Sequence, residues 1–427
     1  MDVFVLIGTL LLFIAMGVPV AYSLGLAALV AAWWADIPFE GVMIKISEGV
    51  NRFSLLAIPF FVLAGAIMAE GGMARRLVNF AFVLVGWIRG GLSLVNILAS
   101  SFFGCISGSS VADTASIGTV MIPQMVKAGY PRVFATNVTI CGSVQAILIP
   151  PSHNAVIYSL AAGGTISIGH LFIAGVFPGL LLGLSLVALC LVIAHREGYP
   201  KGEAVPFRQS IRIAIDALWG LGTMLIILGG ILSGIFTATE SASIACVYAF
   251  LVTMFIYRDY KWRDLPLLVH RTVKTVAMVM ILIGFASAFG YMMAIMQLPA
   301  KLTAFFLTVS DNKYVVLLLI NLMLLVLGCL MDLAPLLLIC TPILLPVVKT
   351  FGVDPLHFGM IMMVNLGIGL VTPPVGTTLF VGCAVGKVTI EQVMKEIWPF
   401  YGAMLVTLAL VTYVPAVSLW LPSLFKF

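Results

Sequence analysis

The scarcity of charged residues is the feature that most restricts how this chain can fold. Of its 427 residues, 62% are hydrophobic and only 9% are charged, whereas soluble proteins carry roughly 25% charged residues. A surface of this composition is too apolar for water but suits the lipid-facing side of a helix bundle. At ~20 residues per crossing, the chain has room for ten or more spanning helices. We therefore expect an all-α polytopic membrane protein.

Apolar segments along the chain predict two kinds of membrane element. Continuous apolar segments predict ten helices, at about residues 2–16, 20–35, 55–69, 131–163, 170–194, 214–234, 237–257, 273–295, 355–386 and 397–420. Segments 92–125 and 314–350 each carry a small or polar break near the middle. We interpret both as re-entrant helical hairpins, which enter and leave the membrane on the same side. The amphipathic segments 38–52 and 74–89 are predicted to lie along the interface.

The distribution of Lys and Arg predicts the orientation of these elements. If the N-terminus is outside and neither hairpin crosses, sixteen of the 22 basic residues lie in cytoplasmic loops. The six on the outer side are Lys45, Arg52, Lys301, Lys313, Lys349 and Lys426. This imbalance obeys the positive-inside rule, so we expect an outward N-terminus. The net charge is only +5 and the basic residues are scattered, which argues against a nucleic-acid partner.

Two proline clusters with matched spacing indicate an internal duplication. Pro123 is followed 27 and 28 residues later by Pro150-Pro151, and Pro346 is followed by Pro373-Pro374 at the same distances. Each half is predicted to cross the membrane an odd number of times, so the second half is expected to be inverted. Inverted repeats are typical of transporters that bind solute at the repeat interface near mid-membrane. The predicted parts are a first repeat at 1–194 (hairpin about 92–125, broken helix about 131–163), a cytoplasmic linker at 195–212, and a second repeat at 213–427 (hairpin about 314–350, broken helix about 355–386).

The tip of the first hairpin is rich in oxygen atoms. Residues 104–114 read GCISGSSVADT, with five hydroxyl or carboxylate side chains among the last eight residues. Such groups are costly in a membrane unless they face a cavity or an ion. A helix break here would free carbonyls that suit Na⁺ and N–H groups that suit a carboxylate. The alternative is that small Ser and Gly residues merely let helices pack closely.

The paired prolines of the first half predict an unwound segment opposite this tip. Pro150 and Pro151 lack N–H donors and disfavour helix in the preceding residue. An unwound segment at membrane depth must line a cavity or be buried in protein. Ser152 and Asn154 can then supply oxygen atoms. His153 either relays protons or is a structural, hydrogen-bonded residue.

The second half repeats this plan with fewer hydroxyl groups. Its hairpin tip reads GCLMDLAP at 328–335, and its proline break reads VTPPVGTT at 371–378. Asp113 and Asp332 are therefore acids in equivalent hairpins. Each either caps a half-helix or takes a direct part in binding an ion or solute.

Two further acids have simpler interpretations. Glu240 lies at a predicted turn between two helices, where it is expected to be a cap, with a role in transport as the alternative. Asp216 follows Arg212 by four residues, so these two side chains are expected to form an ion pair on one helix face.

Taken together, these segments resemble the large membrane (M, or DctM) subunit of the tripartite ATP-independent periplasmic (TRAP) transporters. The resemblance covers essentially the whole chain. The segments that carry it are GCISGSSVADTASIGTVMIPQM at 104–125, ILIPPSHN at 147–154, ATES at 238–241, GCLMDLAPLLLICTPILLP at 328–346 and VTPPVGTT at 371–378. The combination is highly specific, although no single segment would be. The chain looks most like the sialic-acid members, with C4-dicarboxylate or other sugar-acid members as alternatives.

The resemblance implies a function and a set of partners. The function is sodium-driven uptake of an organic acid, such as sialic acid or another carboxylate, across the bacterial inner membrane. The implied mechanism is an elevator motion, in which hairpins and broken helices slide along a scaffold. The implied partners are a periplasmic binding protein and a small four-helix membrane subunit, here expected as a separate chain. The N-terminus is then periplasmic, and no cofactor is expected beyond the transported Na⁺.

The resemblance also implies where ions and solute bind. Family sodium sites lie where hairpin tips face broken helices. The implied ion ligands are Ser107, Gly108, Ser109, Pro150, Asn154, Gly328, Asp332, Thr372 and Thr377. The predicted solute contacts are Ser109, Ser110, Asp113, Asn154, Asp332 and Thr377.

Three other functions fit the sequence less well. An intramembrane aspartyl protease could use Asp113 and Asp332, but the GxGD sequence of such enzymes is missing, so we expect no enzyme. A channel would need a continuous pore, whereas two closed hairpins indicate a gated carrier. The nearest alternative is a stand-alone sodium/carboxylate elevator symporter that works without a binding protein.

Overall fold

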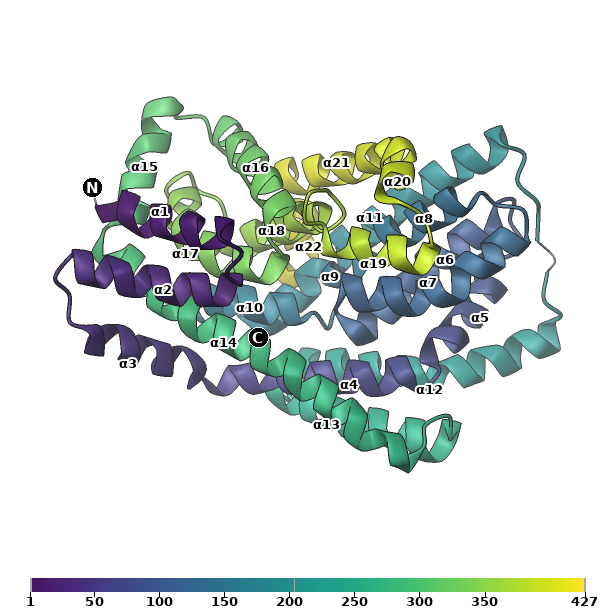
Figure 1. Ribbon diagram of the computed structural model, residues 1–427. Coiled ribbons are helices and arrows are strands. Elements are labelled where there is room, and N and C mark those ends of the chain that lie inside the picture. Colours follow the sequence, from purple (N-terminus) through teal and green to yellow (C-terminus); the bar gives the residue numbers. More distant parts are fainter. Residues whose placement is uncertain (1, 203, 426–427) are drawn as a thin grey trace.

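The computed structural model describes residues 2–202 and 204–425, which are organised almost entirely as helices (Figure 1). Glu203, in the predicted linker, and Lys426, among the outer basic residues, lie outside the described residues. Seven helices of the described part are long and apolar enough to cross a membrane, or up to nine if each bent pair of helices is one span. The prediction of an all-α polytopic membrane protein with hairpins and broken helices is confirmed.

The first half of the chain runs from α1 to α11. Its elements are α1 (Asp2–Ala15), α2 (Val20–Trp34), α3 (Phe39–Val50), η1 (Phe53–Leu56), α4 (Ala57–Glu70), α5 (Met73–Val85), α6 (Gly91–Ser107), α7 (Ser110–Lys127), α8 (Arg132–Ser143), α9 (Gln145–Leu148), α10 (His153–Ala161) and α11 (Ile168–Arg196). The first hairpin is α6 and α7, which pack against each other. The first broken helix is α8 to α10, bent by 52° at its break.

The second half of the chain repeats this order. Its elements are α12 (Phe207–Leu232), α13 (Ala238–Leu251), η2 (Val252–Tyr257), η3 (Trp262–Asp264), α14 (Leu265–Ile295), α15 (Leu298–Val309), α16 (Lys313–Leu330), α17 (Leu333–Thr350), α18 (Pro355–Gly369), α19 (Thr377–Gly386), α20 (Ile390–Glu396), α21 (Trp398–Tyr413) and α22 (Ala416–Ser423). The second hairpin is α16 and α17, and the second broken helix is α18 and α19. The peptide bond between the paired prolines is cis in both broken helices.

The helices form two groups joined by two short arms. The scaffold consists of α1 to α4 with α12 to α14; α2, α3 and α4 all pack on the long helix α14. The hairpin body consists of α6 to α11 with α16 to α22, where the first hairpin also packs on α19 of the second half. Figure 1 shows α4, α12 and α13 along one side of the molecule, with α1, α2 and α3 stacked at one end. The arms α5 and α15 each contact both groups.

A buried asparagine fixes each hairpin to its broken helix. The Asn96 side chain on α6 donates a hydrogen bond to the Thr139 hydroxyl on α8 at 2.7 Å. Asn321 occupies the corresponding place on α16, where its Oδ1 accepts a hydrogen bond from the Asn365 amide of α18 at 2.8 Å. Breaking a buried polar contact leaves an unsatisfied group that costs about 1–3 kcal/mol. These contacts therefore favour joint movement of hairpin and broken helix.

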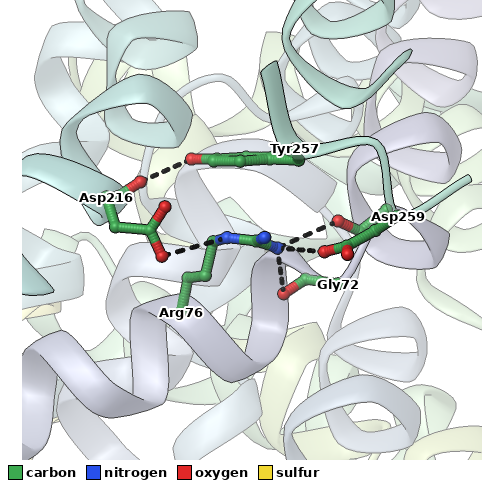
Figure 2. A network of polar contacts seen from close by, with 6 residues as sticks. Gly72, Arg76, Asp216, Tyr257 and Asp259 are labelled. Atoms are coloured by element: carbon green, nitrogen blue, oxygen red, sulfur yellow. Dashed lines mark hydrogen bonds and ion pairs between the residues drawn. The ribbon is translucent and has the colours of Figure 1, made fainter. Parts of the chain in front are cut away.

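A polar network attaches the beginning of arm α5 to the scaffold. Figure 2 shows the Arg76 guanidinium between Asp216 of α12 and Asp259, beneath the ring of Tyr257. Arg76 Nε lies 3.1 Å from Asp216 Oδ2, and its guanidinium carbon lies 3.8 Å from the Tyr257 ring centroid. The Tyr257 hydroxyl in turn donates to the Asp216 carbonyl at 2.6 Å. A planar guanidinium suits this combination of carboxylates and an aromatic face.

Several sequence predictions need correction. Asp216 pairs with Arg76 rather than with Arg212, because the folded chain brings α5 beside α12. α14 begins at Leu265, well before the predicted residue 273, and α15 was not predicted. The predicted helix at 397–420 is divided into α21 and α22. Helices α11 and α12 extend into the predicted linker, whose described non-helical residues are 197–202 and 204–206.

The inverted orientation of the two halves remains a prediction that labelling can test. We expect single cysteines at Ala204, in the linker, and Asp311, before α16, to react with a membrane-impermeant maleimide from opposite sides. The native cysteines provide a low background, since six are buried and Cys329 is half-buried. Labelling of both positions from the outer side would contradict the inverted repeat.

Candidate functional site

The first hairpin breaks at two non-helical residues. α6 ends at Ser107, Gly108 has a φ of 60°, and Ser109 is extended and precedes α7. A left-handed residue here suits glycine, since a side chain would be strained. The Ser109 hydroxyl accepts a hydrogen bond from the Ala112 N–H at 3.4 Å and so caps α7. The break therefore presents the last carbonyls of α6 beside the first N–H groups of α7.

The first broken helix faces this tip, as predicted. α9 ends at Leu148 and α10 begins at His153, with extended backbone at Ile149 and Ser152. The Asn154 side chain donates a hydrogen bond to the Gly108 carbonyl at 3.4 Å. A Cβ atom on Gly108 would lie only 2.9 Å from the Pro151 carbonyl oxygen. The tip and the proline break are thus in direct backbone contact.

The second hairpin meets the second broken helix in the same way. α16 ends at Leu330, and Asp332 stands at the N-cap position of α17. The Val375 N–H in the break donates to the Cys329 carbonyl at 3.0 Å. The Thr377 hydroxyl, at the beginning of α19, donates to Asp332 Oδ1 at 3.3 Å. Thr372 turns back to its own helix, where its hydroxyl donates to the Ile368 carbonyl at 2.8 Å.

Small residues allow these close approaches in both halves. A Cβ on Gly104 of α6 would lie 2.7 Å from Ala146 Cα on α9. A Cβ on Gly369 of α18 would lie 2.6 Å from Gly328 Cα on α16. Cβ atoms do not approach other atoms this closely, so each hairpin arm needs glycine where it crosses its broken helix. Gly328, a predicted ion ligand, thus has a packing role in this structure.

The two hairpin tips meet around one small cavity. Its volume is about 70 Å³, and its polar lining consists of Ser109, Ser110, His153, Asn154 and Asp332. Since a water molecule occupies roughly 30 Å³, the space suits an ion with a water rather than an organic acid. Four half-helices begin at or beside this cavity, and the positive ends of their dipoles favour an anion nearby. Carbonyls from the preceding half-helices favour a cation.

Asp113 lies away from the cavity. Its side chain is completely buried beneath the tip beside Ser100, and neither carboxylate oxygen makes a hydrogen bond of good geometry with a described residue. The capping alternative for Asp113 is wrong, because Ser109 caps α7. Asp332 makes no capping hydrogen bond either, although it occupies the N-cap position. Of the predicted solute contacts, Ser109, Ser110, Asn154 and Asp332 come together here, and Thr377 is bonded to Asp332.

The other two titratable residues differ in outcome. Glu240 is a cap, as expected: its carboxylate accepts from the Thr237 N–H at 2.7 Å, and Thr237 accepts from the Glu240 N–H at 3.3 Å. His153 lines the cavity, and the described residues provide no hydrogen bond to its ring. The hydrogen-bonded interpretation of His153 is therefore not what this structure shows.

Three residues that bridge the site were not predicted. Ser110 shares hydrogen bonds with Ser143 of α8 at 2.8 Å and with Thr378 of α19 at 3.0 Å. The Tyr401 hydroxyl on α21 donates to the Val371 carbonyl in the second break at 2.7 Å. Thr378 follows the predicted Thr377 directly, so its sequence position was a signal. Ser143 and Tyr401 are separated from the breaks in sequence and gave none.

The chain is similar over most of its length to proteins of known families. Residues 7–417 match the family model of the tripartite ATP-independent periplasmic transporter, DctM component. The C4-dicarboxylate TRAP transporter large permease protein DctM of Pseudomonas aeruginosa is 42% identical over 94% of both chains. The sialic acid TRAP transporter large permease protein SiaM of Vibrio cholerae is 38% identical over 96% of both.

Two further similarities bear on assembly and fold. The isethionate TRAP transporter permease protein DctMQ of Oleidesulfovibrio alaskensis is 40% identical over 97% of this chain and 66% of its own length. The crystal structure of the Alcanivorax borkumensis YdaH transporter superposes with a TM-score of 0.59 at 15% identity. It covers 90% of this chain and 87% of the other.

The glycine contact at the first site can be tested by stability. We expect Gly104→Ala to lower the melting temperature in detergent by a few degrees, because overpacking costs about 1–3 kcal/mol. Gly402→Ala on α21 is the matched control, since a Cβ there meets no atom within 4 Å. The control should melt at or slightly above the wild-type temperature. Equal melting of the two variants would contradict the close approach of α6 and α9.

Proposed function

Because the chain belongs to the DctM component family of the tripartite ATP-independent periplasmic transporters, we propose that it drives organic-acid uptake with sodium. The observation that carries this proposal is the meeting of two hairpin tips and two helix breaks around one oxygen-lined cavity. Hydroxyl, carbonyl and carboxylate oxygens are the ligands that hard cations prefer. The ion ligands are the tip and break residues, and Asp332 is the carboxylate among the cavity's lining residues.

The proposed movement is an elevator step of the hairpin body along the scaffold. The first tip already rests on scaffold helix α4, where a Cβ on Gly65 would lie 3.2 Å from the Ile106 carbonyl oxygen. Because Gly65 has a hydrogen atom in place of a side chain, α4 leaves room for the tip to slide past it. Ions would hold the tips and breaks together during the step, while the helix N-termini attract the solute's carboxylate.

We further propose the tripartite assembly that the family's description names. A periplasmic binding protein would deliver the solute, and a small membrane subunit would be a separate chain. The proposed location is the bacterial inner membrane, with the N-terminus in the periplasm.

The proposed solute class is organic acids, without a preference for sialic acid. Relatives of comparable similarity carry names with C4-dicarboxylate, isethionate and sialic acid. Uptake into proteoliposomes of a panel of these acids, with and without the cognate binding protein, tests the assignment. Uptake that needs a binding protein supports the tripartite system, and equal uptake without it supports a stand-alone symporter.

Removing oxygen atoms from the first tip should weaken sodium dependence. We expect Ser107→Ala combined with Ser109→Ala to raise the half-saturating Na⁺ concentration about thirtyfold, because two polar contacts contribute ~1 kcal/mol each. Ser116→Ala with Thr119→Ala, farther along α7, is the matched control and should leave it unchanged. A folded tip variant with wild-type sodium dependence would remove this ion site.

The two hairpin acids should differ in their effect on transport. Asp332→Asn removes the carboxylate on the cavity, and contacts to a charged group contribute roughly 1.5–3 kcal/mol. We expect it to weaken sodium binding about ten- to a hundredfold and to abolish sodium-dependent thermal stabilisation. Asp113→Asn changes a buried group away from the cavity and should cost less uptake per folded molecule. Normal transport and sodium stabilisation in Asp332→Asn would show that this acid is structural.

A further inference from the structure

A second hollow separates the scaffold from the hairpin body. Its volume is about 290 Å³, roughly four times that of the cavity at the tips. Scaffold helices α3 and α14 form one wall, and α10 and α17 of the hairpin body form the other. Two glycines in its lining leave free space inside it, since a Cβ on Gly290 or on Gly163 would meet no atom within 4 Å. In the predicted topology, two crossings (α1 and α2) precede residues 45–52, so the hollow opens on the same side as the N-terminus.

The charged groups around this hollow are predominantly basic. Its lining includes Lys45, Arg52 and Glu48, which leaves one net positive charge. Lys45 Nζ lies 2.6 Å from Glu48 Oε2 and 5.9 Å from the ring centroid of Tyr291. The Arg52 guanidinium has no ion pair or hydrogen bond among the described residues. An unpaired guanidinium, with its fork of N–H donors, can bind a carboxylate with two hydrogen bonds.

Two helices lead from the tip cavity to this hollow. On α10, Asn154 lines the cavity and Leu160 lines the hollow; on α17, Leu333 follows Asp332 at the cavity and Leu338 lines the hollow. Asn154 to Leu160 and Asp332 to Leu338 are both six-residue intervals, which correspond to ~9 Å along a helix. The hollow therefore lies one short step outward from the ion site along both repeats.

We propose that this hollow is an outer holding site for the anionic solute, in which Arg52 binds the solute's carboxylate and Lys45 adds attraction. The site rests on the proposed function, which makes the solute an organic acid, the N-terminal side the outer side and the hairpin body the moving part. A held acid would lie between scaffold and hairpin body, where a step of the body can collect it. The basic lining of the hollow favours anionic solutes, whereas the tip cavity couples solute uptake to Na⁺.

The charge selectivity of the hollow can be measured without knowing the solute. Gly290→Cys places a thiol in the hollow, where anionic and cationic methanethiosulfonate reagents are applied from the N-terminal side of oriented vesicles. We expect Arg52→Gln to lower the ratio of anionic to cationic reaction rates about two- to fivefold, as Coulomb's law gives for a unit charge at roughly 8 Å in a water-filled hollow screened by salt. Lys349→Gln, on α17 outside the hollow, is the matched control. An unchanged ratio in the Arg52→Gln background would overturn the proposal.

Transport kinetics then distinguish a solute site from a lipid site. With the acid that the wild type transports, Arg52→Gln should raise KM for entry severalfold while leaving kcat and the KM for exit unchanged. An equal change in both directions would indicate a structural role and overturn the proposal. So would an effect present only in vesicles with phosphatidylglycerol, which would assign Arg52 to lipid headgroups. If the wild type transports no organic acid, the proposed function fails by that result, while the reagent ratio still decides whether the hollow selects anions.

Discussion

Everything in this molecule depends on keeping broken helices inside a membrane. A backbone group without a partner in lipid costs several kcal/mol, so a break is tolerated only where protein or a cavity surrounds it. Here four breaks are brought to one place, where each hairpin tip covers the break in its own half of the chain. The same exposed carbonyls and N–H groups that make the breaks costly make them suited to ions and carboxylates.

The two halves of the chain meet this constraint with different residues. In the first, α6 crosses α9 where Gly104 contacts Ala146, and the Asn154 side chain donates a hydrogen bond to the Gly108 carbonyl. In the second, α16 crosses α18 where Gly328 contacts Gly369, and the Tyr401 hydroxyl of α21 donates a hydrogen bond to the Val371 carbonyl. Asn96 and Asn321 then tie each hairpin to its broken helix. Because these contacts lie within the hairpin body, the proposed movement of the body against the scaffold would leave them intact.

The breaks could be predicted from sequence because their causes are local. Paired prolines mark the breaks in the broken helices, and the Gly108-Ser109 step and the polar Asp332 mark the breaks in the two hairpins. Contacts between distant segments could not be predicted in the same way. Arg76 pairs with Asp216, which is 140 residues away in sequence. Asp113 is buried beneath the first tip, although Ser109 and Ser110, close to it in sequence, line the cavity. Helix α15 was missed although Pro299 in its first turn is a sequence signal, because the break before it is a left-handed Gln297, a residue type that does not predict such a turn.

Hydrogen–deuterium exchange can test whether the two tips and two helix breaks bind sodium as one unit. With Na⁺ in place of K⁺ at equal ionic strength, backbone amides at 107–110, 149–153, 331–333 and 370–377 should gain protection together, while scaffold helices such as α2 remain unchanged. The gain should follow one sodium concentration dependence in the tip and break of each repeat. Protection of a tip without its break, or no sodium effect at any of the four segments, would contradict a shared ion-holding body.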